Sequence, residues 1–158
     1  MQKNGRIQWI PLLIALIIPL AVGALSGFLT MNAMDDYRAL NQPPLSPPSS
    51  VFPIVWTVLF ILMGIASYFV YVSDSQYKKT ALILYGVQLA MNFLWTLIYF
   101  NAGAYLFAFV WLVALWCVII ATTVIFWAIK PLAGVLMLPY ILWVTFAGYL
   151  NFMIYRLN

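Results

Sequence analysis

Long apolar stretches dominate the chain and are separated by short polar connections. A helix needs about 20 consecutive apolar residues to cross the roughly 30 Å hydrocarbon core of a bilayer, and five of the stretches reach that length. The expected spans are residues 7–31, 51–72, 80–100, 104–129 and 132–155. Because the connections after the second, third and fourth spans are short, these helices should be antiparallel neighbours. The sequence therefore predicts an all-α bundle of five transmembrane helices, which forms a single domain over residues 1–158.

The connection between the first two spans, residues 32–50, is the longest and the richest in proline. Each proline fixes φ, lacks an N–H and keeps the preceding residue out of the α region, so residues 43–48 should be extended and stiff. Ser50, or the serine before it, is placed to cap the next helix. We expect this long loop to form a lid over a cavity between the helices, with Pro43 and Pro47 in contact with the ligand.

The first span follows two basic residues and resembles a secretory signal, with a small-residue sequence at 22–24 similar to a cleavage site. Its apolar run is too long for a signal core, so we interpret it as a membrane span. With five spans, the termini lie on opposite sides of the membrane. Basic residues on the N-terminal side are Lys3, Arg6, Lys78, Lys79 and Lys130, against Arg38 and Arg156 on the other. This bias predicts a cytoplasmic N-terminus, and we expect the membrane to be a bacterial cytoplasmic membrane.

Three of the spans carry a face on which aromatic side chains alternate with polar or small ones. Residues spaced by three or four positions lie on the same side of a helix. Such spacing joins Trp56, Phe60, Met63 and Ser67 in the second span, Gln88, Asn92, Trp95 and Tyr99 in the third, and Tyr140, Trp143, Ala147 and Asn151 in the fifth. Polar groups are costly in hydrocarbon, so these faces should point into the bundle.

Two interpretations of these faces are open. In the first they surround a cavity, where Ala147 leaves a gap between aromatic rings that a flat ligand could enter. In the second, Asn92 and Asn151 form hydrogen bonds between helices and the aromatic residues are ordinary packing, which is the commoner arrangement in membrane bundles.

Pairs of small residues four positions apart allow close approach of helix backbones. Gly86 and Ala90 form such a pair on the side of the third span opposite its polar face, and Gly23 and Gly27 form another on the first span. Either pair could be a dimer contact or packing within one chain. We expect Gly86 and Ala90 to form the dimer face, because they point away from the expected cavity.

The composition places the chain among integral membrane proteins, with 66% hydrophobic and 6% charged residues and a mean hydropathy of +1.04. The net charge of +4 comes from scattered basic residues, which does not indicate a nucleic-acid partner. The chain has no histidine, and its single cysteine, Cys117, lies in the middle of a span. We therefore expect no disulfide framework and no metal site.

Catalytic chemistry is also poorly represented. The only carboxylate side chains, Asp35, Asp36 and Asp74, lie in connections, and no Lys, Arg, Asp, Glu or His lies well inside a span. This disfavours proton-coupled transport, and the lack of a base beside a nucleophile disfavours hydrolysis. No catalytic residue is assigned and no cofactor is expected to be required. A reaction would have to use a bound, light-absorbing ligand beside Trp or Tyr.

Several motifs in order along the chain resemble one family. They are Pro43, Pro47-Pro48, Phe52-Pro53 followed by Trp56, Gln88-Leu89-Ala90 with Asn92 and Trp95, and Pro139-Tyr140 with Trp143, Ala147 and Leu150-Asn151. Together they are similar to the TspO/MBR family, the tryptophan-rich sensory proteins related to the mitochondrial translocator protein or peripheral benzodiazepine receptor. The first loop departs from the family in having fewer aromatic residues.

The resemblance implies a five-helix bundle, usually dimeric, with a pocket beneath the first loop that binds porphyrins and, in relatives, sterols or benzodiazepine-type drugs. It places pocket residues at Trp56, Asn92, Trp95, Trp143 and Ala147. It also links the family's tryptophans to light-dependent breakdown of protoporphyrin IX, which would make Trp56 and Trp143 the photochemical residues here.

We therefore predict a membrane receptor or sensor that binds a flat hydrophobic ligand, a porphyrin such as protoporphyrin IX, between the helices under the first loop. The alternatives are a light-dependent porphyrin-degrading catalyst, a tetrapyrrole or sterol transporter, and a purely structural membrane protein. The expected partners are the ligand, membrane lipid and a second copy of the chain. The expected ligand-binding residues are Pro43, Pro47, Trp56, Phe60, Gln88, Asn92, Trp95, Tyr99, Tyr140, Trp143, Ala147 and Asn151.

Overall fold

The computed structural model describes residues 5–158, and every regular element in that part of the chain is helical. The elements are α1 (Trp9–Thr30), the 3-10 turn η1 (Met31–Ala33), α2 (Met34–Ala39), α3 (Val51–Tyr71), α4 (Lys78–Thr96), the π-helical segment η2 (Leu97–Asn101), α5 (Tyr105–Ile129) and α6 (Pro131–Leu157). Within the described residues, five helical stretches are long and apolar enough to cross a membrane. The predicted all-α, five-span class is confirmed.

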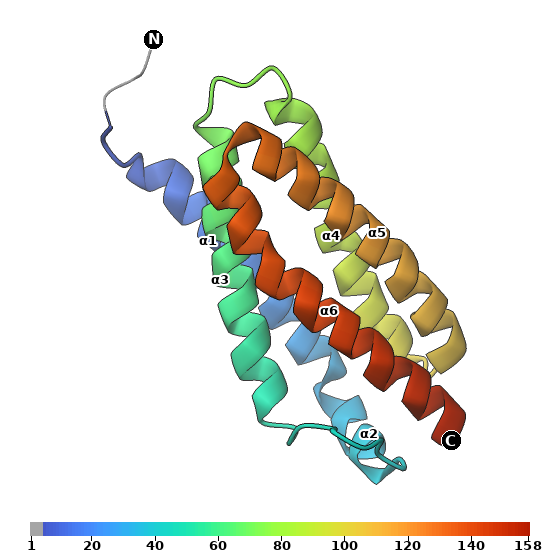
Figure 1. Ribbon diagram of the computed structural model, residues 1–158. Coiled ribbons are helices and arrows are strands. Elements are labelled where there is room, and N and C mark those ends of the chain that lie inside the picture. Colours follow the sequence, from blue (N-terminus) through green and yellow to red (C-terminus); the bar gives the residue numbers. More distant parts are fainter. Residues whose placement is uncertain (1–4) are drawn as a thin grey trace.

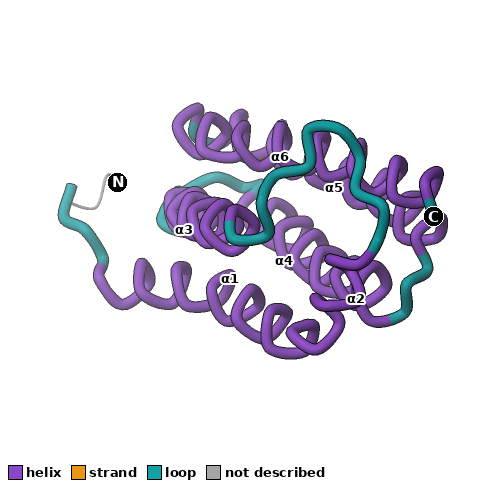
Figure 2. The backbone as a smooth tube through the Cα atoms, turned by 90° about the horizontal axis from the view of Figure 1, so that it is seen from below, coloured by secondary structure: helices purple, strands orange, loops and turns teal. Residues whose placement is uncertain are grey.

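The long helices lie side by side in one bundle, with α1 at its edge (Figure 1). The most extensive contact is between α5 and α6, while α1 packs mainly on α3 and α4 packs mainly on α5. The two ends of the described chain lie at opposite ends of the bundle, as an odd number of spans requires (Figure 1). The loop of residues 40–50 runs across the end of the bundle opposite the start of α1 (Figure 2).

The basic residues predicted on the N-terminal side lie, where they are described, at one end of the bundle. Lys78 begins α4 and Lys130 separates α5 from α6, at the same end as the start of α1 (Figure 1). The Nζ of Lys78 donates to the Ser73 carbonyl at 2.9 Å, and the Nζ of Lys130 lies 4.6 Å from the centroid of the Phe69 ring. Lys3 lies outside the described residues. The side of the membrane that this end faces stays a prediction.

The connection between the first two spans is shorter as a loop than predicted. The chain stays helical through η1 and α2, so only residues 40–50 are without regular helix. Residues 31–39 contain no proline. Asp35 lies in the first turn of α2 and Arg38 in the last, where each complements the helix dipole, and their side chains are 3.2 Å apart. These local signals favour helix over the expected loop.

The proline-rich segment is also not extended throughout, which corrects the prediction for residues 43–48. The Ser46 N–H donates to the Pro43 carbonyl at 3.2 Å, which closes a turn with Pro44 and Leu45 at its centre. Leu45 has a φ of 68° and is 81% exposed. Proline is favoured at the first central position of such a turn, but the second requires positive φ and usually holds glycine or asparagine. The leucine side chain therefore occupies a strained position.

The start of α3 differs from prediction in one detail. Ser50 is the residue before the helix, but its side chain forms no capping hydrogen bond. The backbone supplies the contact instead, because the Val51 N–H donates to the Pro48 carbonyl at 2.9 Å. Pro53 lies in the first turn of α3, where a missing N–H costs little.

The half of the bundle that contains the start of α1 is solidly packed, and we call it the closed half. Met63, Val70, Phe126 and Ala133, from α3, α5 and α6, are completely buried there. The other half contains the end of α1, α2, the start of α3 and the second part of α6. We call it the open half, because it holds a cavity of about 530 Å³.

Candidate ligand-binding site

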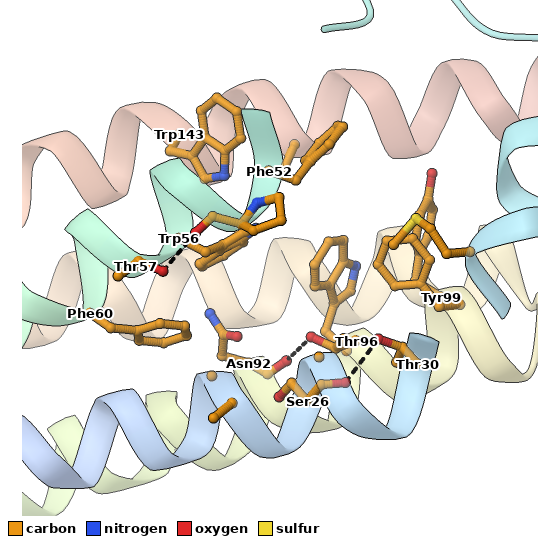
Figure 3. Close-up of a pocket in the computed structure, with 18 of the residues that line it drawn as sticks. Ser26, Thr30, Phe52, Trp56, Thr57, Phe60, Asn92, Thr96, Tyr99 and Trp143 are labelled. Carbon is orange, nitrogen blue, oxygen red and sulfur yellow. Dashed lines mark hydrogen bonds between the residues drawn. The ribbon is translucent and has the colours of Figure 1, made fainter. Parts of the chain in front are cut away.

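A cavity of about 530 Å³ lies in the open half, between α1, α2, α3, the end of α4 with η2, and α6. This volume is within the range of small-molecule sites in proteins. Five of the predicted residues give the cavity its aromatic walls: Trp56, Phe60, Trp95, Tyr99 and Trp143. Ala147 and Asn92, also predicted, line the cavity as well, and Figure 3 shows Asn92 among the aromatic residues. The three faces recognised in the sequence therefore do meet around a shared space.

Asn92 and Tyr140 belong to a buried hydrogen-bond chain that forms the floor of the cavity. The Asn92 Nδ2 donates to the Tyr140 hydroxyl at 2.8 Å, and that hydroxyl donates to the Gln88 Oε1 at 2.7 Å. The Gln88 Nε2 in turn points to the Met63 sulfur at 3.6 Å. This series of hydrogen bonds connects α4 to α6 and α3. Gln88 and Tyr140 do not line the cavity themselves.

A second pair of hydrogen bonds orients one wall of the cavity. The Trp95 Nε1 donates to the Asn151 Oδ1 at 3.1 Å, and the Asn151 Nδ2 donates to the Tyr105 carbonyl at 2.8 Å. Trp95 also stacks on Tyr99, with ring centroids 5.3 Å apart and an interplanar angle of 19°. Asn151 therefore positions an aromatic wall from behind.

The two interpretations of the polar faces turn out to apply to different members of each face. Gln88, Tyr140 and Asn151 form interhelical hydrogen bonds and are packed behind the cavity, as the packing interpretation expected. Asn92 does both, since its Nδ2 is committed to Tyr140 while the residue also lines the cavity. Its Oδ1 is the atom that it can offer to a ligand.

Trp143 carries an unpaired polar group. Its Nε1 is buried and has no hydrogen-bond partner among the described residues, and in Figure 3 this nitrogen points from α6 toward Trp56. The ring packs edge-on against Phe52, with centroids 6.0 Å apart. A buried donor without a partner costs roughly 1–3 kcal/mol. Because the nitrogen itself is inaccessible, a ligand acceptor in the cavity would reach it only after the indole ring moves.

The cavity walls carry no charged side chain within the described part of the chain. Three of its hydroxyl groups bond to their own helices: Ser26 to the Val22 carbonyl, Thr30 to the Ser26 carbonyl, and Thr96 to the Asn92 carbonyl, at 2.8, 2.8 and 3.1 Å. These hydroxyls are therefore already satisfied as donors. The site is suited to an uncharged aromatic surface with few polar atoms.

The proline-rich loop of residues 40–50 contributes no residue to the lining of this cavity. Pro43 is buried and Pro47 half-buried, but neither lines the cavity. The roof is formed instead by Met34 and Tyr37 of α2 and by Phe52 at the start of α3. The reason is that the helix continues past Thr30 and places α2, rather than the prolines, over the opening.

The contribution of α1 to the cavity was missed in the sequence. Gly23, Ser26, Gly27 and Thr30 all line it. Their spacing is that of one helical face, and they are small or polar within an otherwise apolar span. That pattern was the available signal, but it was interpreted as a possible dimer contact for Gly23 and Gly27.

The predicted dimer residues on α4 lie where the sequence placed them. Gly86 and Ala90 are exposed, and a Cβ atom built on Gly86 would have no neighbour within 4 Å. Gln88 and Asn92, on the other side of α4, are buried. The surface is therefore free in one chain, and its role as a dimer face stays a prediction.

The fold and the cavity define a class, namely a helical membrane protein with an aromatic-walled small-molecule site between its spans. Comparison with known proteins then identifies the family. The model of the TspO/MBR family matches residues 15–156, so the chain belongs to the TspO/MBR family. The resemblance drawn from the motifs is confirmed.

Individual relatives agree with this assignment. The chain is 38% identical to the tryptophan-rich protein TspO of Chlorobaculum tepidum, over 98% of this chain and 99% of that protein. It is 39% identical to protein CrtK of Rhodobacter capsulatus, over 77% of this chain and 78% of that one. It is 32% identical to the translocator protein of Homo sapiens, over 95% and 91% of the two chains. The chain is thus an integral membrane protein of a family of sensory and translocator proteins.

Proposed function

We propose that this protein is a membrane receptor or sensor that binds protoporphyrin IX, or a closely similar flat tetrapyrrole, in the cavity of the open half. The observation that carries the proposal is a cavity of about 530 Å³ between helices, which is lined by eight aromatic side chains and, among the described residues, by no charged one. Aromatic side chains favour flat π-systems through offset stacking and edge contacts. Sterols and benzodiazepine-type drugs are further candidates for the same space.

The proposed roles follow from position. Trp56, Trp95 and Trp143 pack on the ring, and Ala147 leaves room for its edge. Trp56 lies 6.4 Å from Trp95, centroid to centroid, so the two indoles form one continuous wall. The carboxylates of the porphyrin point out of the cavity, because a charge is costly to bury without a partner.

The test is a titration of the purified protein with protoporphyrin IX, followed by quenching of tryptophan fluorescence. A Trp56→Ala, Trp143→Ala double variant should raise Kd at least tenfold, because each lost aromatic contact is worth about 1 kcal/mol. Trp9→Ala is the matched control, since Trp9 is 64% exposed and distant in sequence from the cavity residues. Equal affinity of the double variant and the control would refute the proposal.

A second candidate function is light-dependent breakdown of the bound porphyrin. It is favoured by the unbroken contact of oxidisable rings from Trp56 through Trp95 and Tyr99 to Tyr105, with centroid distances of 6.4, 5.3 and 5.3 Å. Illumination of the complex, with loss of the porphyrin absorbance band as the readout, separates the two functions. A pure binder gives loss no faster than free porphyrin, whereas a photochemical catalyst gives faster loss that a Trp56→Phe, Trp143→Phe variant slows.

We further propose that two copies associate through Gly86 and Ala90 in a bacterial cytoplasmic membrane, with the N-terminus in the cytoplasm. The exposure of both small residues on α4 supports a close contact between α4 helices at this point. Gly86→Leu should shift a dimer to monomer in light-scattering measurements of the detergent-solubilised protein. Val124→Leu on the exposed surface of α5 should leave the dimer intact.

A further inference from the structure

The contact between α1 and α3 is close only in the closed half and at its border. A Cβ atom built on Gly64 of α3 would lie 2.7 Å from the Ala15 carbonyl oxygen, and one built on Gly23 of α1 would lie 2.5 Å from the Phe60 ring. Neither site has room for a side chain, so the two helices touch there. One turn further along α1, a Cβ on Gly27 would meet nothing within 4 Å. The helices therefore separate beyond Gly23.

Four residues frame the space that this separation leaves. Ala24 and Gly27 lie on the α1 side, and Pro53 and Thr57 lie on the α3 side. All four line the cavity, and all four are exposed rather than buried. The Thr57 hydroxyl is satisfied by the Pro53 carbonyl at 2.7 Å, so it does not bridge the space. We call these four residues the window.

The window lies at membrane depth. A helix rises about 1.5 Å per residue, which puts Gly27 about 27 Å along α1 from Trp9, near the far edge of a hydrocarbon core of roughly 30 Å. Pro53 and Thr57 are in the first two turns of α3, which starts at the same end of the bundle. The outer side of the window therefore faces lipid acyl chains rather than water.

The alternative route, through the loop end of the bundle, is held shut. The Asn41 N–H donates to the Asn158 Oδ1 at 3.0 Å, and the Tyr149 hydroxyl donates to the Pro44 carbonyl at 2.9 Å. Beneath the loop, Tyr37 is buried against the rings of Tyr99 and Phe52. Entry from water would require these contacts to break, whereas no hydrogen bond among the described residues bridges the window from α1 to α3.

We propose that the cavity opens sideways to the membrane through the window, that a phospholipid acyl chain enters it when no ligand is bound, and that apolar ligands arrive by the same route. The identity of the ligand rests on the proposed function, but the lateral opening does not. It predicts that lipid acyl chains enter and leave the cavity even when no porphyrin is present.

The first experiment tests the opening without any ligand. The protein is placed in phosphatidylcholine vesicles that contain a small fraction of phospholipid with a diazirine on its acyl chain, irradiated, and mapped by mass spectrometry. The wild type should be labelled at Leu150, which lines the cavity but is only 3% exposed. Gly27→Phe and Thr57→Phe, which fill the window from opposite sides, should each reduce this labelling at least fivefold.

Ala21→Phe is the matched control, because Ala21 is exposed on α1 but does not line the cavity. It should leave the labelling of Leu150 unchanged. Absence of label at Leu150 in the wild type would overturn the proposal, and so would equal labelling in Gly27→Phe, Thr57→Phe and the control. A second copy that covers the window would also abolish the label, and would overturn the proposal in the same way.

The second experiment measures the route taken by a ligand. In stopped-flow transfer of protoporphyrin IX from vesicles, Gly27→Phe should lower both the association and the dissociation rate constants about tenfold, whereas a simple loss of affinity would raise dissociation. An Asn158→Ala, Tyr149→Phe variant, which releases the loop, should leave both rates unchanged. Faster transfer in that variant would show that the porphyrin enters at the loop end of the bundle, and would overturn the proposed route. If the wild type binds no porphyrin, the proposed function fails while the labelling result still decides the window.

Discussion

Each half of the bundle has a glycine between α1 and α3, but the glycine in the closed half lies at a tight helix contact and the one in the open half lies beside open space. In the closed half, Gly64 has no Cβ because the Ala15 backbone occupies that space. In the open half, Gly27 has no Cβ and nothing occupies the space. Both residues are glycines on facing helices in apolar surroundings, so their sequence context is nearly the same. The difference shows that small residues in a membrane helix mark either a contact or an opening, and that the neighbouring helix decides which.

The most direct way to break this comparison is to place the same side chain in each half. Gly64→Leu must displace the backbone of α1, so the free energy of unfolding should fall by about 3 kcal/mol, the upper range for overpacking. Gly27→Leu adds a side chain in open space and improves helix propensity, so the change should be below about 1 kcal/mol. Thermal or denaturant unfolding in detergent measures both. Similar losses in the two variants would mean that the halves do not differ as described.

Filling the cavity itself should be the next largest effect. Ala147→Phe places a ring where the cavity wall now recedes, and the Kd for protoporphyrin IX should rise at least tenfold with little change in the unfolding midpoint. Leu142→Phe, on the 71% exposed surface of the same helix, should leave Kd within twofold of the wild type. Fluorescence titration measures both. A tight complex with Ala147→Phe would place the ligand elsewhere.

The border between the halves can be weakened at the hydrogen-bond chain below the cavity. Tyr140→Phe removes the hydroxyl that joins Asn92 to Gln88 and leaves both amides short of a partner in an apolar interior. Hydrogen bonds between membrane helices are worth about 0.6–1.7 kcal/mol, so the unfolding free energy should fall by about 1 kcal/mol. Tyr155→Phe, which removes an exposed hydroxyl at the end of α6, is the control. Equal unfolding free energies of the two variants would indicate that this hydrogen-bond chain contributes nothing to stability.

The smallest effect is expected in the loop over the open half. Leu45→Asn should stabilise the turn by up to about 1 kcal/mol, because asparagine tolerates positive φ better than leucine does. Leu45→Ala keeps the Cβ atom and should give no such gain. Hydrogen exchange of residues 41–50 is the sensitive readout, with slower exchange expected only in the asparagine variant. Equal exchange in both variants would show that the turn is not strained.

Much of this protein was determined by its sequence alone. Five apolar stretches required five helices, because a backbone in hydrocarbon must satisfy its own hydrogen bonds. Helical spacing then placed Trp56, Trp95 and Trp143 on inward faces, since which side chains share a face depends only on position along one helix. The motif order also identified the family. All of these features are local or come from one element at a time.

The tertiary structure decided which residues of each inward face line the cavity and which form hydrogen bonds between helices. Asn151 and Trp143 lie two turns apart on the same face of α6, yet Asn151 is hydrogen-bonded to Trp95 behind the cavity, whereas Trp143 lines the cavity. The sequence could not separate them, because the outcome depends on distances between helices that packing sets to within an ångström. The same reason explains why α2 rather than the prolines covers the cavity. It also explains why Gly27 opens a window while Gly23, one turn away, closes a contact.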